Sequence, residues 1–339
     1  MLLQEFRDQY REALLQFLWG QWTSLGVAGQ AASTDTRVID PEALFLFTTS
    51  IGRQDQRLFD EMLDWLNLND RFLNVQRIKT MHKNANLGDA TVISATATVL
   101  GLRNKSIKWK TLSNLASSTQ IQSNESLFFL RNGHPMPVLG ETDSSFHAFG
   151  LLRNPIVHRN LSKTFSTKNA QTLLLQLRSL FGVNSRSEIV CYLLLHSEGK
   201  IPRIAEECYY SWRSVQDSLF EMGYSGMLNF TASKKTRSYY LNHAHWFSLL
   251  GRSPENSSTW FCWAPVYAGL EQLWKYLQDP ALLNMDQTTL IGDLRYFLTV
   301  THRDIFDRAG FGRFLRGLDA MSEQEYLQSL MEKIQGILG

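Results

Sequence analysis

The chain has 339 residues, of which 44% are apolar and 19% are charged, which allows two or three domains and excludes a disordered polymer. It has no apolar run of about 18 residues, which excludes a conventional membrane-spanning helix, and Glu5, Arg7 and Asp8 interrupt any secretory signal at its start. Its three cysteines form no CxxC pair, which predicts free thiols in a cytoplasmic protein and no zinc site.

The net charge of +2 is distributed unevenly along the chain. Residues 71–186 carry 15 basic and 4 acidic side chains, a balance of +11, whereas residues 1–70 have a balance of −6 and residues 187–339 a balance of −3. A basic middle between acidic ends indicates contact with a polyanion. A solvated basic surface that touches no partner is the alternative interpretation.

Residues 1–83 are expected to form a helical N-terminal domain. The spacing of apolar residues predicts helices at Leu2–Trp22, Arg57–Leu66 and Leu73–His82. Asp40-Pro41 predicts an N-cap followed by proline in the first turn of another helix that runs to Phe47. The Phe59–Lys83 segment also has the pattern of a degenerate helix-turn-helix without a wing.

Residues 84–167 are expected to form a basic, partly irregular connecting region. Within it we expect a buried helix at Asn84–Gly101, exposed segments at Asn104–Lys110 and Ser113–Ser126, and irregular stretches at Arg131–Glu141 and Asn154–Thr167. A further helix is predicted at Asn169–Phe181. Basic side chains between residues 153 and 186, with no acidic residue among them, are expected to support contact with a polyanion. These are Arg153, Arg159, Lys163, Lys168, Arg178 and Arg186.

Residues 168–250 show the most informative pattern. Helices are predicted from Arg186 to near Gly199, over Arg203–Cys208 after the opening pair Ile201-Pro202, and over Trp212–Met222 with Ser211 as its N-cap. In the last helix Val215, Leu219 and Met222 share the inward side, and Trp212, Arg213, Ser214, Gln216 and Asp217 share the outward side. Two strands follow, Met227–Thr231 and Ser238–Leu241, joined by the basic turn Ala232–Arg237.

Residues 251–339 are expected to form a helical C-terminal domain, with helices at Trp260–Leu277, Thr288–Val300 and Tyr326–Leu338. The aromatic residues Trp260, Trp263, Tyr267 and Trp274 indicate core or dimer interface in preference to an effector pocket. Cys191 and Cys208 are expected in the core. His243 and His245 are expected on one strand in a structural role, because no partner ligand lies nearby. The chain has no GxSxG, P-loop or GxGxxG motif, so we expect no enzyme and no cofactor.

The segment Ser185–Leu241 resembles the winged helix-turn-helix regulators of bacteria, in the broad ArsR/MarR-like class. The resemblance is carried by RSEIVCYLLLHSEG, IPRIAEECYYSWRSVQDSLFEMGYSGML and NFTASKKTRSYYL. It implies a mainly α protein with a winged domain, three helices plus a two-stranded wing, flanked by helical regions.

The resemblance further implies a homodimeric transcriptional regulator that binds double-stranded DNA, with the third helix in the major groove and the wing on the backbone. The residues it assigns to DNA binding are Ser211, Trp212, Arg213, Ser214, Gln216, Lys234, Lys235 and Arg237. The alternatives are a winged-helix adaptor for a protein partner and an antitoxin-like autorepressor that binds a toxin.

Overall fold

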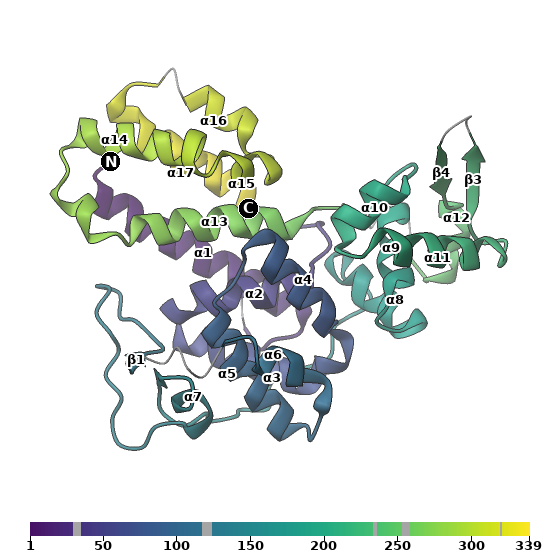
Figure 1. Ribbon diagram of the computed structural model, residues 1–339, viewed down its shortest axis with the longest axis horizontal. Helices are drawn as coiled ribbons and strands as arrows, with labels where there is room; N and C mark the ends of the chain where they lie inside the picture. Colours follow the sequence, from purple (N-terminus) through teal and green to yellow (C-terminus); the bar gives the residue numbers. More distant parts are fainter. Residues whose placement is uncertain (30–34, 117–123, 233–235, 253–257, 319–320) are drawn as a thin grey trace.

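The computed structural model describes residues 1–29, 35–116, 124–232, 236–252, 258–318 and 321–339. The protein is mainly helical, and its larger sheet in these ranges is an antiparallel pair of four-residue strands. No helix within the described ranges is both long and apolar enough to cross a bilayer. Figure 1 shows a large body built from both ends of the chain and a smaller lobe to its right.

The main body contains α1–α7 and α13–α17. Its N-terminal elements are α1 (Leu3–Leu25), α2 (Pro41–Ile51), α3 (Gln56–Asn69), α4 (Val75–Ala85), α5 (Ala90–Arg103), α6 (Lys110–Ser113), β1 (Glu125–Ser126), α7 (Ser144–His147) and β2 (Leu151–Leu152), with 3₁₀ turns at Gly52–Gln54, Asp70–Phe72 and Ile107–Trp109. Its C-terminal elements are α13 (Trp263–Leu277), the 3₁₀ turn Pro280–Asn284, α14 (Gln287–Tyr296), the π-helical turn Phe297–Thr301, α15 (Arg303–Arg308), α16 (Gly312–Leu318) and α17 (Glu323–Leu338).

The second lobe contains the elements between these two parts. They are the 3₁₀ turn Ala170–Thr172, α8 (Leu173–Phe181), α9 (Ser185–Leu194), α10 (Ile201–Cys208), α11 (Trp212–Gly223), β3 (Asn229–Ala232), β4 (Arg237–Tyr240) and α12 (His243–Leu249). The lobe has its own hydrophobic core, to which Val38 of the N-terminal region also belongs.

The helices predicted at the two ends of the chain share one core. Tyr10 of α1 donates its hydroxyl to the backbone oxygen of Leu270 in α13 at 2.8 Å. Phe47 of α2 stacks on Tyr267 of α13, with ring centroids 4.6 Å apart. The expected connecting region contributes α5 to the same core. The core of the main body is therefore complete only when segments far apart in sequence pack together.

Local signals in the sequence account for several of these helix boundaries. Asp40 accepts hydrogen bonds from the backbone amides of Glu42 and Ala43, which confirms it as the N-cap of α2 ahead of Pro41.

The Asn104–Lys110 segment differs from its expected exposure, because Trp109 is fully buried and donates its indole N–H to Asp70. A short segment gives no periodic pattern from which such a single anchoring residue can be recognised.

A buried ionic cluster joins the main body to the second lobe. Arg178 of α8 binds both carboxylate oxygens of Glu42, at 2.7 and 2.9 Å, and also Glu188 of α9 at 2.5 Å. Arg77 of α4 binds the same Glu42 at 2.7 Å and Asp40 at 2.5 Å. These two arginines, Glu42 and Glu188 are each at most 3% exposed.

Burial and close pairing shift the pKa values of the groups in this cluster. Desolvation raises the pKa of Glu188. Desolvation alone would lower the pKa of Arg178, but its contacts with Glu42 and Glu188 outweigh that effect and raise it. The pKa of Asp40 is lowered because Arg77 outweighs the opposing effect of burial. Each charge in the cluster is therefore stabilised only while its partners are present.

We expect Arg178→Met to lower the free energy of unfolding by about 3–5 kcal/mol, because it leaves the Glu42 and Glu188 carboxylates buried with fewer partners. Urea denaturation measures this change. The control is Arg303→Met, which removes an exposed ion pair with Asp307 and should change the free energy by less than about 1 kcal/mol. Equal stability of the two variants would contradict the importance of the cluster.

Candidate nucleic-acid interface

The α11 helix is held in place by its cap and its inward side. The Ser211 hydroxyl accepts a hydrogen bond from the backbone amide of Ser214 at 3.1 Å, which confirms the predicted N-cap. Val215 and Leu219 are buried in the core of the second lobe, and Met222 is partly buried against it. Tyr209 ends α10 in the left-handed region with φ +58°, so the chain turns sharply between α10 and α11.

Most of the predicted α11 residues lie on its solvent-facing side. Trp212 is 51% exposed, the Arg213 side chain is 87% exposed, and Gln216 is also exposed. Ser214 differs, because its hydroxyl turns toward α9 and donates to the Ser185 hydroxyl at 3.3 Å. Arg213 and Gln216 are therefore the polar side chains that this helix presents most freely among those predicted.

The predicted wing residues are described only in part. Lys234 and Lys235 lie outside the described residues. Arg237 is exposed at the start of β4, with its guanidinium 5.0 Å from the centre of the Phe230 ring on β3. The two strands pair in the register Asn229↔Tyr240 to Ala232↔Arg237. Arg237 therefore pairs with Ala232, the last residue of β3, on the same lobe as α11.

A third backbone segment pairs with the two strands, and this pairing was not predicted from the sequence. Gly199, between α9 and α10, exchanges both backbone hydrogen bonds with Tyr239 of β4, each 2.8 Å long. A Cβ atom on Gly199 would lie 2.8 Å from the Tyr192 ring, which leaves no space for a larger residue. Glycine after a helix indicates a helix end, and no separate sequence signal indicates this pairing.

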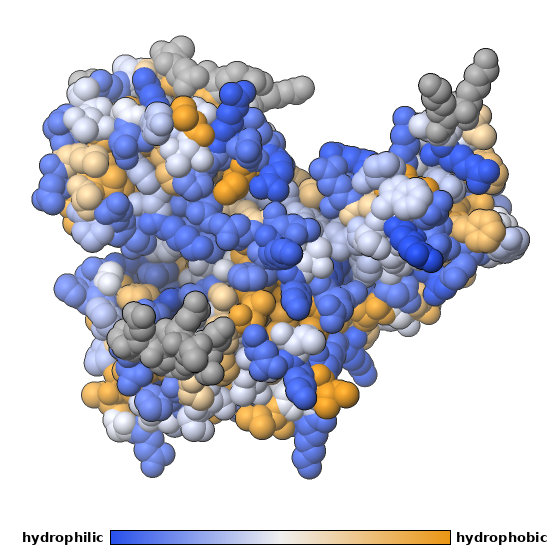
Figure 2. Space-filling view, viewed as in Figure 1, coloured by the Kyte–Doolittle hydropathy of each residue, from blue (hydrophilic) through white to orange (hydrophobic). Residues whose placement is uncertain are grey.

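The outward side of α11 carries paired charges. Arg213 lies 3.8 Å from Asp217 one turn along the helix, and Arg186 of α9 forms an ion pair with Glu221. A shallow groove between the start of α9 and α11 is lined by both of these pairs and by Ser185, Ser211, Ser214 and Ser218. Figure 2 shows hydrophilic and hydrophobic residues intermixed over the lobe. This surface is therefore close to neutral.

Two cations expected to support contact with a polyanion are buried instead, so that part of the prediction was wrong. Arg153 is 1% exposed, pairs with Asp60 at 2.8 Å and packs over the rings of Phe128 and Phe146. Arg178 belongs to the ionic cluster. Asp60 and Glu42, which pair with these two arginines, lie in distant parts of the chain, so the local absence of acids did not indicate free charge. Arg159, Lys163 and Lys168 are exposed as expected.

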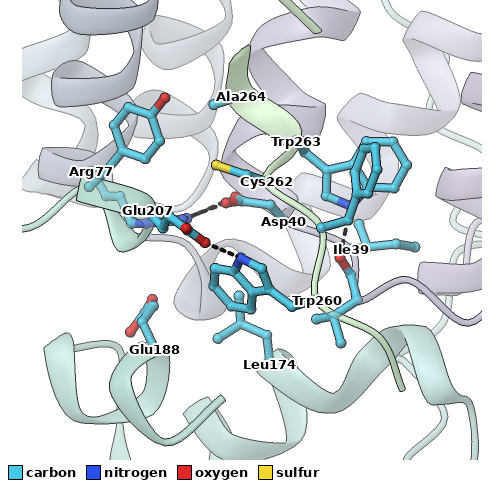
Figure 3. Close-up of a pocket in the computed structure, with 13 residues that line it drawn as sticks. Ile39, Asp40, Arg77, Leu174, Glu188, Glu207, Trp260, Cys262, Trp263 and Ala264 are labelled. Carbon is cyan, nitrogen blue, oxygen red and sulfur yellow. Dashed lines mark hydrogen bonds and ion pairs between the residues drawn. The ribbon is translucent and has the colours of Figure 1, made fainter. Parts of the chain in front are cut away.

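The cavity beside the aromatic residues of the C-terminal region is small. It has a volume of about 20 Å³ and lies between the main body and the second lobe, lined by Trp260, Trp263, Glu207, Arg77 and neighbouring residues. Figure 3 shows Glu207 bound to the Trp260 indole and Arg77 bound to Asp40. Such a volume holds about one water molecule. Trp263, Tyr267 and Trp274 are buried, which confirms the interpretation of these aromatics as core.

Burial and secondary structure define the surroundings of the cysteine thiols and of two histidines. Cys191 and Cys208 are buried as predicted, and burial raises the pKa of Cys262 to about 12, so that thiol stays protonated at neutral pH. His243 and His245 lie in α12 and not on a strand, which corrects that expectation, because Asn242 caps a helix there. Among the described residues, no group of three or more His, Cys, Asp or Glu side chains is placed to hold a metal ion.

Comparison with known proteins found no matching family model, no similar curated protein and no similar solved structure. The functional interpretation therefore depends on the residues and their geometry alone.

We expect Ser211→Ala to lower the free energy of unfolding by about 1 kcal/mol, because it leaves an amide in the first turn of α11 without its acceptor. Chemical denaturation measures the change. Ser211→Asp is the matched control, since aspartate also caps helices and should keep wild-type stability within about 0.5 kcal/mol. Equal loss in both variants would show that the cap does not stabilise α11.

Proposed function

We propose that the second lobe is a winged helix-turn-helix and that the protein binds double-stranded DNA as a transcriptional regulator. The observation that carries the proposal is the geometry of α11, a capped helix with one side buried and the opposite side exposed, next to an antiparallel strand pair. An exposed helix of this kind fits the major groove, and a strand pair beside it reaches the backbone.

Three helices followed by two strands, with Gly199 adding a third backbone segment, support the winged-helix assignment of Ser185–Leu241. In this proposal Arg213 and Gln216 read base edges, because their side chains are exposed near the N-terminal end of α11. Arg237 contacts phosphates together with Lys234 and Lys235, which lie three and two positions before it in the sequence.

The direct test is a salt titration of binding to a duplex of about 30 base pairs. The triple variant Lys234→Ala, Lys235→Ala, Arg237→Ala should flatten the slope of log affinity against log salt by about three, because three phosphate contacts are lost. Gln216→Ala carries no charge change and should leave that slope intact while altering the sequences selected from a random duplex pool.

The proposal is wrong if the wild-type protein fails to bind duplex DNA at about 50 mM salt, where phosphate contacts are strongest. A protein-interaction adaptor is then the better interpretation. One observation favours that second candidate. Phe220 of α11 and Tyr224, the residue that follows this helix, are 62% and 78% exposed, with their rings in edge-to-face contact 5.0 Å apart.

We also propose that the protein acts as a two-fold dimer, as paired half-sites on DNA require. Most of the aromatic side chains of α13 are buried in the protein's own core, so they are not available as the dimer surface. Sedimentation velocity on the full chain, with and without duplex, should give a dimer. A monomer in both conditions at high concentration rejects this part of the proposal.

A further inference from the structure

The α11 surface has too little net positive charge to hold a duplex by itself. Its two arginines, Arg186 and Arg213, are balanced by Glu221 and Asp217. Sequence-independent affinity for DNA comes from lysine and arginine contacts that neutralise phosphates. If the lobe binds DNA, cations beyond those of the predicted wing have to come from an element fixed close to α11.

The exposed side of α4 has the charge that α11 lacks. The helix VQRIKTMHKNA contains no acidic residue. Its apolar residues Val75, Ile78 and Met81 are buried, whereas Gln76, Lys79 and Lys83 are exposed. Neither lysine forms an ion pair with the described residues. Lys79 and Lys83 are one helical turn apart, a rise of about 6 Å, which lets both ammonium groups reach one phosphate strand.

The N-terminal end of α4 is fixed to the N-terminal end of α11. Asn74, whose side chain caps α4, donates to the Tyr210 hydroxyl at 2.8 Å, and Tyr210 directly precedes the cap Ser211 of α11. Arg77 of α4 donates to the backbone oxygen of Cys208 at the end of α10, also at 2.8 Å. In Figure 1, α4 lies at the side of the main body that faces the second lobe.

The two arginines of the buried cluster make this connection rigid without contributing to the surface charge. Arg77 is 3% exposed and bound to Asp40 and Glu42, so it cannot reach a phosphate. It fixes the position of α4 against the α10–α11 turn. The lysines further along α4 remain accessible to a phosphate, because their side of the helix faces away from the buried residues.

We propose that Lys79 and Lys83 of α4 bind phosphates of the duplex next to the segment contacted by α11. The inference rests on the proposed DNA binding and adds to it a second contact surface on the main body. DNA held in this way spans both lobes. The phosphate contacts of α4 then contribute affinity for every sequence, while α11 contributes the preference among sequences.

The test compares the wild-type chain, Lys79→Ala with Lys83→Ala, and a control in which Arg7→Ala is combined with Arg131→Ala. The control removes the same formal charge near the start of α1, where the Arg131 backbone contacts Arg11, on the side of the main body away from the second lobe. Alanine is a favourable helix residue, so the lysine variant should keep its wild-type unfolding curve. Binding to a duplex of about 30 base pairs is followed by fluorescence anisotropy at several salt concentrations.

Loss of two phosphate contacts should flatten the salt slope by about 1.8, so that the fall in affinity between 50 and 200 mM salt becomes about tenfold smaller. Lys79→Arg with Lys83→Arg should keep the wild-type slope, because both charges remain. The control should also keep it.

The inference is overturned if the wild-type protein binds with a steep salt slope and the Lys79/Lys83 alanine variant keeps that slope. A change of equal size in the Arg7/Arg131 control also overturns it, because the effect is then one of net charge and not of position. Absence of wild-type duplex binding at low salt is a different outcome, which rejects the proposed function itself and this inference with it.

Discussion

The bidentate pairing of Arg178 with Glu42 is the interaction on which the arrangement of the whole protein depends. It connects α8, the first helix of the second lobe, to α2, a helix at the centre of the main body. Glu188 and Arg77 extend this pair to α9 and α4. Charges this deeply buried stabilise a structure only in the arrangement that pairs them all, so the cluster specifies one relative position of the lobes.

This constraint determines what the candidate interface can be. A lobe attached by a flexible linker would present α11 alone. Here Arg77 also binds the backbone at the end of α10 and Asn74 binds Tyr210, so the N-terminal ends of α4 and α11 are held next to each other. These two contacts connect a basic helix of the main body to the candidate interface on the second lobe. In the proposed DNA complex, α4 adds affinity for every sequence and α11 supplies the preference among sequences.

The parts of the fold that were predictable from sequence are those fixed by neighbouring residues. The caps Asp40 and Ser211 and the inward positions Val215 and Leu219 all follow from local chemistry and helical spacing. The parts that were not predictable depend on partners distant in sequence. Arg178 looked like a surface cation because Glu42, its main partner, lies 136 residues away. The pairing of Gly199 with Tyr239 had no local signal either.

The core shared by both ends of the chain has a consequence for synthesis on the ribosome. The Tyr10 hydroxyl meets its acceptor on a residue 260 positions later, which at typical elongation rates takes roughly 13–50 s to be made. During that interval the apolar sides of α1 and α2 are without α13, whereas the second lobe can assemble its contacts within a short stretch of chain. The nascent N-terminal helices therefore expose their apolar sides for longer than the helices of the second lobe do.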